Sequence, residues 1–447
     1  MDNFILSKNQ RFTAEITDMN DSGNGVCKIN GAVVFVIGGV TGDVCDIKII
    51  KVTKKYAVAV IEKLTKTSIY RTEPRCPYKR CGGCAFQNIT PEYENELKKN
   101  IVSAAFLRAG ISLPVCDIVY AGDFYGYRNK AQFPAGYNKD GVLGFGYYAE
   151  KSHDVIFCES CAIAKPEFAD IAKTVCKTAE KYGIAPYDEE SGSGVLRHIC
   201  FRSGISGILL TLVINADSLP SCNKFVSDVT ATHKEITSVF INVNKAQTNV
   251  IYGDKFINVY GKTTLTDRLC GLTFDIAPAS FYQVNHDCTE ALYSKAASLL
   301  DIKGDETVID LYCGVGTVGL CAAKNAKKLI GVEIIPEAVE NAKRNAEING
   351  VKSAEFYCGD SSIVRSVVKG KVDALIVDPP RKGLSDDVIK SIIDIMPDKL
   401  LYISCDPNTL ARDLQKLLAY YTADRAYPFN MFPRTGHVET VCLLSRQ

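Results

Sequence analysis

A short segment near residue 310 largely determines how the C-terminal part of this 447-residue chain can fold. Residues 307–311 read TVIDL, an apolar, β-branched run typical of a buried strand. Gly314, Gly316 and Gly319 follow in a G-x-G-x-x-G pattern, which lets the backbone approach a ligand closely where a helix begins. The segment predicts a nucleotide-type cofactor site, but alone it does not separate a dinucleotide from S-adenosylmethionine (SAM).

The alternation of strand, glycine turn and helix continues to residue 404. Further strands are expected at 329–333, 354–357, 372–377 and 400–404, and helices at 314–323 and 336–349. This order predicts an α/β fold in which helices cover both faces of a parallel sheet.

Four carboxylates follow these strands in sequence. Asp310, Glu333, Asp360 and Asp378 each stand at the expected carboxyl end of a strand. Ligands bind at that edge of an open α/β sheet, and a carboxylate there can hold the two ribose hydroxyls of an adenosine. A series of four fits SAM better than NAD. The alternative is that they are ordinary strand-end or helix-capping acids.

A cysteine and a glutamate suggest the chemistry. Cys405 directly follows the strand at 400–404. Carbon 5 of a pyrimidine is a poor nucleophile, but a thiolate that adds to carbon 6 makes carbon 5 able to attack a sulfonium methyl. A base must then remove the proton on carbon 5, and Glu439 is the candidate, with His437 as its rival. Since the chain has 18 cysteines, an inert Cys405 is the alternative.

The turn Asp378-Pro379-Pro380 supports a second hypothesis. Amino-group methyltransferases use a D-P-P turn followed by an aromatic residue to hold a flipped base. Here Arg381 follows, which argues against methylation of an exocyclic amine. A third hypothesis is an RNA-binding or ribosome-assembly factor that is not an enzyme.

At these residues the chain resembles the 23S rRNA (uracil-5-)-methyltransferases that carry a TRAM domain and an iron–sulfur cluster. The matching strings are SFYQVN at 280–285, DLYCG at 310–314, DPPRKG at 378–383, SCDP at 404–407 and GHVE at 436–439. The resemblance implies a class I SAM-methyltransferase sheet, with Cys405 as the nucleophile and Glu439 as the base that form 5-methyluridine in 23S rRNA. Some members act on tRNA, so the same chemistry on a tRNA uridine is the alternative.

The resemblance also implies the residues of the SAM site. They are Gln283, Tyr312, Thr317, Glu333 and Asp360, with Asp378 between the cofactor and the uracil. Thr317 departs from an asparagine that some members have at this position.

The N-terminal residues predict an RNA-binding module. Residues 11–62 contain five short strands separated by glycine turns, which is typical of a small barrel of the oligonucleotide-binding kind. Between Lys48 and Arg80 lie ten basic residues and only two acidic ones, a candidate phosphate-facing patch or else a solvated surface. The resemblance implies that residues 11–65 form the TRAM domain.

A group of cysteines follows the barrel. Cys76, Cys81 and Cys84 are spaced x4 and x2, and Cys158 or Cys161 could supply a fourth ligand to zinc or to an iron–sulfur cluster. The resemblance implies a [4Fe-4S] cluster with Cys161 as the fourth ligand, although the first spacing is one residue shorter than is usual in the family. Its role would be structural or RNA-ordering, because the x4 spacing differs from the x3 of radical-SAM enzymes.

Together with the resemblance, which implies that residues 93–121 pack with the catalytic domain, these observations predict three domains. They are the TRAM domain at 1–68, a central iron–sulfur and RNA-binding domain at 69–92 and 122–270, and the methyltransferase domain at 93–121 and 271–447. The basic and aromatic strings at 125–130 and 197–198 are candidate RNA contacts in the central domain.

The expected partner is RNA with a flipped uridine, because a base must leave its stack to reach a nucleophile. No protein partner is indicated. Neither an apolar run long enough to span a membrane nor a signal-peptide pattern is visible, so we expect a soluble, cytoplasmic protein.

Overall fold

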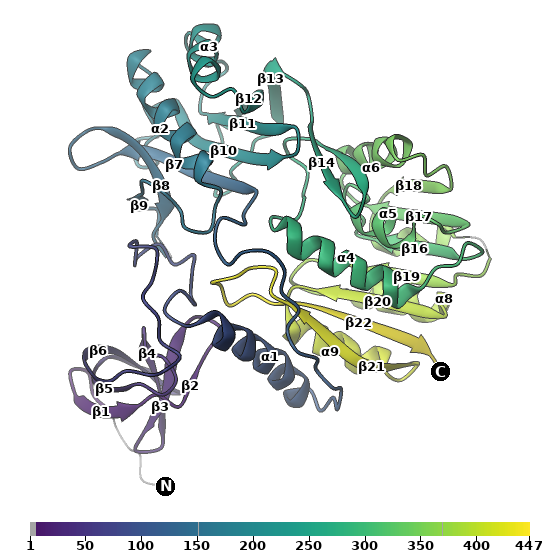
Figure 1. The fold of residues 1–447 in the computed structure, drawn as a ribbon, viewed down its shortest axis with the longest axis horizontal. Helices are drawn as coiled ribbons and strands as arrows, with labels where there is room; N and C mark the ends of the chain where they lie inside the picture. The colour runs from purple at the N-terminus through teal and green to yellow at the C-terminus, as the bar shows by residue number, and fades with distance from the viewer. Residues whose placement is uncertain (1–5, 151, 369) are drawn as a thin grey trace.

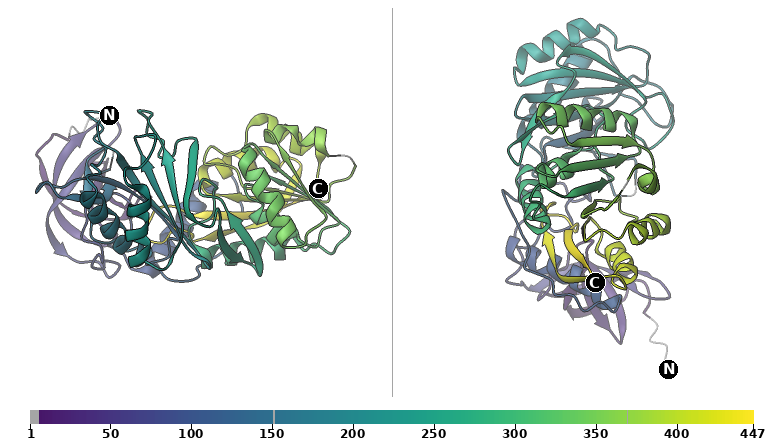
Figure 2. Two further views of the ribbon diagram at one scale, coloured as in Figure 1. Left: turned by 90° about the horizontal axis from the view of Figure 1, so that it is seen from above. Right: turned by 90° about the vertical axis from the view of Figure 1, so that its right-hand side faces the viewer.

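The computed structural model describes residues 6–150, 152–368 and 370–447. In these ranges the strands form a six-stranded sheet, two seven-stranded sheets and a two-stranded hairpin. Figure 1 shows the N-terminal sheet at the lower left, the central sheet above it and the C-terminal sheet on the right, and Figure 2 gives two further views. No helix in the described part of the chain has the length and apolar character needed to cross a membrane.

The N-terminal sheet has the expected small, curled form. Its strands are β1 (Arg11–Glu15), β2 (Asp18–Met19), β3 (Asn24–Ile29), β4 (Ala32–Ile37), β5 (Val44–Val52) and β6 (Ala57–Lys66). They are ordered β1-β5-β6-β4-β3-β2, and β1 also packs beside β3. Cys45, Ile47 and Ile49 alternate along β5 and are fully buried, because successive side chains of a strand point to opposite faces.

The central region is a mixed sheet with helices α2 and α3 packed on it. Its elements are β7 (Lys130–Tyr137), β8 (Leu143–Tyr148), β9 (Val155–Phe157), α2 (Pro166–Lys181), β10 (Leu196–Gly204), β11 (Gly207–Ile214), α3 (Cys222–Thr232), β12 (Ile236–Val243) and β13 (Lys255–Gly261). The strand order is β13-β12-β11-β10-β7-β8-β9. The strands and both helices share one hydrophobic core.

The long helix α1 (Pro91–Arg108) has a capped start and a glycine after its end. The Thr90 side chain accepts a hydrogen bond from the Tyr93 amide, and Gly110, with φ of +69°, stands just past its end. The helix packs against α9 (Pro407–Leu417) and β21 (Tyr421–Phe429) of the C-terminal region, and residues 111–121 run along β21. The chain thus contacts the C-terminal sheet before it enters the central region.

The C-terminal region combines a hairpin with a seven-stranded sheet. Its elements are β14 (Leu265–Leu269), β15 (Leu272–Ile276), α4 (His286–Leu300), β16 (Thr307–Leu311), α5 (Thr317–Ala323), β17 (Lys328–Glu333), α6 (Pro336–Ile348), β18 (Ala354–Cys358), η1 (Ser361–Ile363), α7 (Val364–Val367), β19 (Ala374–Val377), α8 (Asp386–Ile395), β20 (Lys399–Ser404), α9 (Pro407–Leu417), β21 (Tyr421–Phe429) and β22 (Glu439–Arg446). The strand order is β18-β17-β16-β19-β20-β22-β21.

The five strands expected from the sequence form a parallel sheet, and two further strands extend it at one edge. Strands β18, β17, β16, β19 and β20 are parallel, but β22 pairs antiparallel with both β20 and β21. The connection between β21 and β22, residues 430–438, is too short for a helical crossover, so β22 returns antiparallel beside β21.

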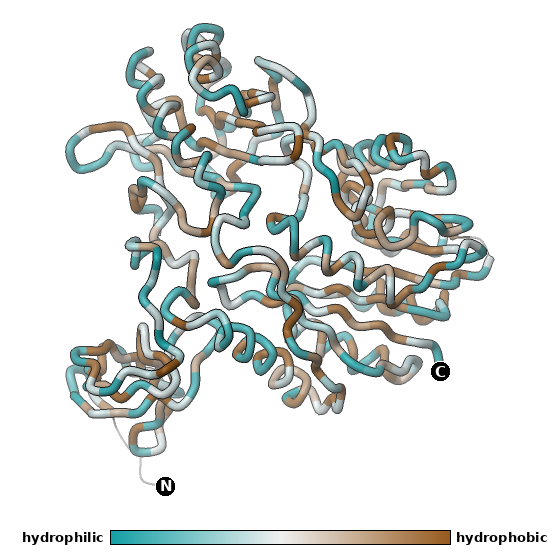
Figure 3. Tube along the Cα trace, viewed as in Figure 1, coloured by the Kyte–Doolittle hydropathy of each residue, from teal (hydrophilic) through white to brown (hydrophobic). Residues whose placement is uncertain are grey.

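Helices cover both faces of this sheet, as expected. Side chains of β16 alternate between two cores: Val308 packs with α4, α5 and α6, whereas Ile309 packs with α1, α8 and α9. In Figure 3 the hydrophobic segments follow the inner strands, and hydrophilic segments gather in the outer helices and loops. Burial of these apolar faces is what holds the sheet's carboxyl edge in place.

Candidate active site

The carboxyl ends of the parallel strands gather the predicted chemistry at one edge. Glu333 is the last residue of β17, Asp378 directly follows β19, and Cys405 directly follows β20. Glu439 is the first residue of the antiparallel β22 and pairs with Phe429 of β21. Because β22 runs in the opposite direction beside β20, its first residue lies at the same edge as Cys405.

The glycine loop and Glu333 form a single backbone unit. The Gly314 amide donates to Glu333 Oε2 at 3.1 Å, and the Ile335 amide donates to Glu333 Oε1 at 2.9 Å. Tyr312 has φ of +63°, so the chain turns sharply as it leaves β16. Each Glu333 oxygen keeps further lone pairs, so the carboxylate is fixed in place and still able to accept from two hydroxyls.

Asp310 has an anchoring geometry. Its side chain is buried, and its Oδ2 accepts the Gly319 amide at 2.9 Å, which ties β16 to α5. Burial, together with the charges of Asp378 and Glu333, raises the pKa of Asp310 to about 8. A Cβ on Gly319 would lie 2.7 Å from this carboxylate oxygen, which explains the third glycine of the motif.

Thr317 and Asp360 each stand at the start of a short helix. Thr317 opens α5, and its Oγ1 lies 3.2 Å from the hydroxyl of Tyr293, a fully buried residue of α4. Asp360 follows β18 and caps the short helix η1 by accepting the Ser362 amide at 2.9 Å. Asp360 is therefore a helix-capping acid, the alternative considered from the sequence. The hydrogen bond from the Ser362 amide lowers the pKa of the Asp360 carboxyl.

Glu439, Asp378 and Cys405 are ionisable groups whose charges affect one another's pKa values. Burial and the charge of Asp378 raise the pKa of Glu439 to about 8, and burial raises that of Asp378 to about 7. Burial and the charges of Glu439 and Asp378 raise the pKa of the Cys405 thiol to about 12, while the Arg381 guanidinium opposes the rise. Cys405, Asp378 and Glu439 thus lie close enough for their charges to interact, and this group of three at the carboxyl edge of the sheet is the candidate catalytic pocket.

His437 and Arg381 contact each other at this pocket. Arg381 Nη2 lies 3.2 Å from His437 Nε2 and can donate to it when that nitrogen is unprotonated. Burial and the charge of Arg381 lower the pKa of His437, which favours its neutral form. Since Arg381 occupies that lone pair, the geometry gives His437 less scope than Glu439 to take a proton.

Buried Asp413 of α9 supports the loop that follows Asp378. Its carboxylate accepts the Leu384 amide at 2.8 Å and the Tyr402 hydroxyl at 2.7 Å. Gly383, with φ of +72°, turns the chain between these points. Asp413 gave no motif signal in the sequence, because its partners are distant along the chain.

The central region holds the segment that carries Gln283. The Asn129 side chain donates to the Gln283 carbonyl at 3.0 Å, and Arg202 of β10 donates to the Ser280 carbonyl at 2.6 Å. Asn285 caps α4 and donates to the Met431 carbonyl at 3.0 Å. Gln283 is therefore fixed between the central sheet and the loop that precedes Glu439.

Comparison with known proteins identifies this arrangement. Residues 7–61 match the TRAM domain, residues 277–400 the methyltransferase small domain and residues 363–447 the tRNA (Uracil-5-)-methyltransferase family. A Bacillus cereus protein named as an uncharacterized RNA methyltransferase is 40% identical, with 99% of this chain and 98% of that protein covered. A Clostridium tetani protein of the same name is 39% identical, with 98% and 97% covered.

The chain belongs to the RNA (uracil-5-)-methyltransferase family. A solved structure agrees over nearly the whole length: the Pyrococcus abyssi tRNA (uracil-54, C5)-methyltransferase in complex with S-adenosyl-L-homocysteine. It has a TM-score of 0.79 and 28% identity, and the match covers 97% of this chain and 100% of that one. The resemblance to the RNA (uracil-5-)-methyltransferases is confirmed, as are the class I methyltransferase fold and the N-terminal TRAM domain.

In this methyltransferase the cysteine group lines one cavity. Cys76, Cys81 and Cys84 face it together with Cys158 and Cys161. Burial and the charges of neighbouring thiols raise the pKa of Cys84 and Cys158 to about 12. Within residues 6–150, 152–368 and 370–447, no three His, Cys, Asp or Glu side chains are arranged to hold a single metal ion.

The candidate RNA contacts of the methyltransferase differ in exposure. Lys51, Lys54, Lys55, Lys63 and Lys66 of the TRAM domain are exposed. Arg71 instead pairs with buried Asp43. Exposed Arg75 lies 4.3 Å from the Tyr125 ring centre.

The prediction that residues 197–198 contact RNA is wrong. Arg197 is only 4% exposed and donates to the Asn244 and Ala246 carbonyls at 2.9 and 2.8 Å, and His198 is also buried. The basic and aromatic composition of this string reflects packing inside the central sheet, which the sequence pattern alone does not distinguish from surface binding.

Proposed function

We propose that this methyltransferase forms 5-methyluridine in RNA through covalent catalysis by Cys405. The observation that carries the proposal is the pocket that Cys405, Asp378 and Glu439 share beside the Gly314–Gly319 loop. A cysteine and a carboxylic acid at one site supply the nucleophile and the base that substitution at carbon 5 of uracil requires.

In the proposed reaction, Cys405 acts first and Glu439 acts last. The Cys405 thiolate forms a bond to carbon 6 of uracil as the π bond between carbons 5 and 6 breaks. The electron pair of that π bond becomes an enolate shared by carbon 5 and the oxygen on carbon 4, so carbon 5 can accept a methyl group. The Glu439 carboxylate then takes the proton from carbon 5. The electron pair of that C–H bond restores the double bond between carbons 5 and 6, and the Cys405 sulfur leaves. SAM, when bound, supplies the methyl group as a sulfonium.

We assign the SAM site to the residues around the glycine loop. The fixed Glu333 carboxylate suits the two ribose hydroxyls, Tyr312 and Thr317 flank the turn, and Asp360 lies near Tyr312. We include Gln283 because the family resemblance implies it. Asp378, which directly follows β19, would lie between the cofactor and the uracil. Binding of S-adenosyl-L-homocysteine by the Pyrococcus abyssi relative supports a SAM-derived ligand at this edge.

We propose that the cysteine cavity holds an iron–sulfur cluster on Cys76, Cys81, Cys84 and Cys161. All four thiols line one cavity, and a four-iron cluster spaces its thiolates more widely than a single ion does. Thiolate ligands also suit zinc, and the family resemblance is what favours the cluster. The role we assign to it is structural or RNA-ordering.

We propose 23S rRNA as the substrate, on the basis of the motifs and the cysteine group that the chain shares with that branch of the family. The Pyrococcus abyssi relative is named for tRNA, so a tRNA uridine is the competing substrate. The deciding experiment is mass-spectrometric mapping of 5-methyluridine in rRNA and tRNA from a deletion strain, complemented with the wild type or with Cys405→Ala. Loss from 23S rRNA alone supports the proposal, and loss from tRNA alone contradicts the substrate assignment.

The same experiment addresses amino-group methylation. That hypothesis predicts an N-methylated base and an active Cys405→Ala variant. Arg381 occupies the position at which the amino-group enzymes have an aromatic residue. Its guanidinium contacts His437 and lies close enough to Cys405 to lower the pKa of that thiol.

A further inference from the structure

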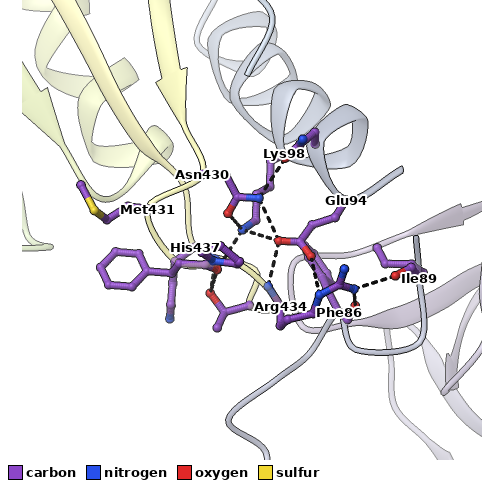
Figure 4. A network of polar contacts seen from close by, with 12 residues as sticks. Phe86, Ile89, Glu94, Lys98, Asn430, Met431, Arg434 and His437 are labelled. Carbon is purple, nitrogen blue, oxygen red and sulfur yellow. Dashed lines mark hydrogen bonds and ion pairs between the residues drawn. The ribbon is translucent and has the colours of Figure 1, made fainter. Parts of the chain in front are cut away.

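The loop that leads into Glu439 is enclosed by parts of the chain that are distant in sequence. Residues 430–438 connect β21 to β22 and reach from the sheet toward the middle of the molecule (Figure 1). Figure 4 shows Glu94 and Lys98 of α1, together with Phe86 and Ile89 from the segment just before α1, around this loop. The mechanism proposed above uses none of these polar contacts.

Glu94 of α1 is the centre of the network. It is fully buried, and its Oε1 accepts three hydrogen bonds, from the Arg434 amide at 2.9 Å, Asn430 Nδ2 at 3.0 Å and Lys98 Nζ at 3.0 Å (Figure 4). A buried carboxylate is stable only when paired and hydrogen-bonded, so Glu94 requires this loop conformation.

Lys98 completes the same contacts from the next turn of α1. Its Nζ donates to Asn430 Oδ1 at 2.6 Å and to the Phe432 carbonyl at 3.0 Å. Like Glu94, the Lys98 side chain has no exposed surface. Removal of one partner of such a buried pair leaves an uncompensated charge, so the network has one low-energy arrangement.

Arg434 fixes the loop from its other side. It is 1% exposed, and its Nη1 donates to the Phe86 and Ile89 carbonyls at 3.1 and 2.7 Å. Its own carbonyl accepts the Phe86 amide at 2.9 Å, and its guanidinium lies 4.9 Å from the Phe124 ring centre. Its φ of +69° is unfavourable for a residue with a side chain and persists only where surrounding contacts enforce it.

The loop is also fixed between Arg434 and Glu439. A Cβ on Gly436 would lie 1.8 Å from the Asp21 carbonyl, so the TRAM domain closely approaches the loop there. His437 contacts Arg381, and Val438 and Glu439 are buried. The direction from which the Glu439 carboxyl enters the pocket is therefore set by contacts that begin at Arg434.

We propose that Arg434 and Glu94 are positioning residues for the proton-abstraction step: they orient the Glu439 carboxyl through the 430–438 loop. They touch neither Cys405 nor the other groups of the pocket, so the earlier bond formation at Cys405 should be largely independent of them. The inference rests on the proposed function, because it needs Glu439 to be the base.

The test separates two steps in one enzyme with Arg434→Lys and Glu94→Gln. Release of tritium from RNA labelled at carbon 5 of uridine measures proton abstraction, and the rate of denaturation-resistant adduct formation with 5-fluorouridine RNA measures attack by Cys405 and methyl transfer. We expect tritium release to fall by about tenfold to a hundredfold, the cost of a misplaced group, while the adduct rate changes by less than about threefold. A methylated enzyme–RNA adduct should then accumulate on ordinary RNA.

Exposed Arg425→Lys on β21 is the matched control, with both rates expected at the wild-type value. Circular dichroism and thermal melting identify variants that fail to fold. If both positioning variants fail, Thr435→Val, which removes the Thr435 Oγ1 bonds to the Phe432 carbonyl and the His437 amide, takes their place.

In folded variants, an equal fall in both rates, or an unchanged tritium release, overturns the inference. A wild-type enzyme that releases no tritium, or a Cys405→Ala variant that still does, overturns the proposed function instead.

Discussion

Asp378 lies close enough to Glu439 for its negative charge to raise the pKa of the Glu439 carboxyl, which burial and this charge together bring to about 8. The two acids reach the pocket from strands of opposite direction, Asp378 from parallel β19 and Glu439 from antiparallel β22. Near neutral pH the free enzyme therefore holds Glu439 largely protonated, and Arg381 is the neighbouring charge that favours its ionised form.

This arrangement predicts the pH dependence of the reaction. A base acts only when ionised, so kcat/KM, which reports groups of the free enzyme, should rise as the pH passes through about 8. Arg381→Gln removes the charge that lowers the pKa values of Glu439 and Cys405, so the rise should move to higher pH. Lys390→Gln, an exposed residue of α8 outside the assigned site, is the control. A shift of the Arg381→Gln profile to lower pH contradicts this account.

Glu333→Gln should weaken SAM binding. The amide nitrogen of glutamine would face either the Gly314 or the Ile335 amide, and the ribose would lose a charged acceptor. Hydrogen bonds to charged groups contribute about 1.5–3 kcal/mol, so we expect the Kd from calorimetry to rise by roughly tenfold to a hundredfold. Glu340→Gln, in a surface ion pair with Lys343 on α6, should leave the Kd unchanged. An unchanged Kd for Glu333→Gln removes it from the SAM site.

The cysteine assignment predicts different effects for two neighbouring thiols. Cys161→Ala should lose most iron and sulfide when the protein is purified without oxygen, because one of four ligands is gone. Cys158→Ala should retain both, although Cys158 lines the same cavity. The measurement is iron and acid-labile sulfide per chain. If only Cys158→Ala loses the cluster, Cys158 and not Cys161 is the fourth ligand. One zinc ion per chain in the wild type would contradict the cluster assignment.

Asp310 should lower the stability of the folded protein as the pH rises. Its pKa in the folded protein is about 8, against an ordinary value of 3.8, so its stabilising contribution is fully present below about pH 4 and is lost as the pH rises through 8. Asp310→Asn keeps a neutral acceptor for the Gly319 amide at every pH. The free energy of unfolding in urea should therefore fall less between pH 5.5 and 8 than in the wild type. The exposed Asp305→Asn should retain the wild-type slope, and the same slope in Asp310→Asn contradicts this role.

Local signals predicted the elements that local chemistry determines. Thr90 and Gly110 delimit α1, and the apolar run at 307–311 forms a buried strand because each feature acts within a few residues. The antiparallel direction of β22 was missed, since it depends on which strand the chain joins after a short loop. The buried network around Glu94 was also missed, because its partners near residues 86 and 434 are brought together only by the complete fold.

Covalent trapping tests the central claim most directly. The enzyme is incubated with SAM and RNA that carries 5-fluorouridine at the target site, and the denatured adduct is digested and mapped by mass spectrometry. We predict one peptide containing Cys405, joined to a methylated 5-fluorouracil nucleotide, and no adduct with Cys405→Ala. An adduct on another residue, or one that persists in Cys405→Ala, would contradict the mechanism.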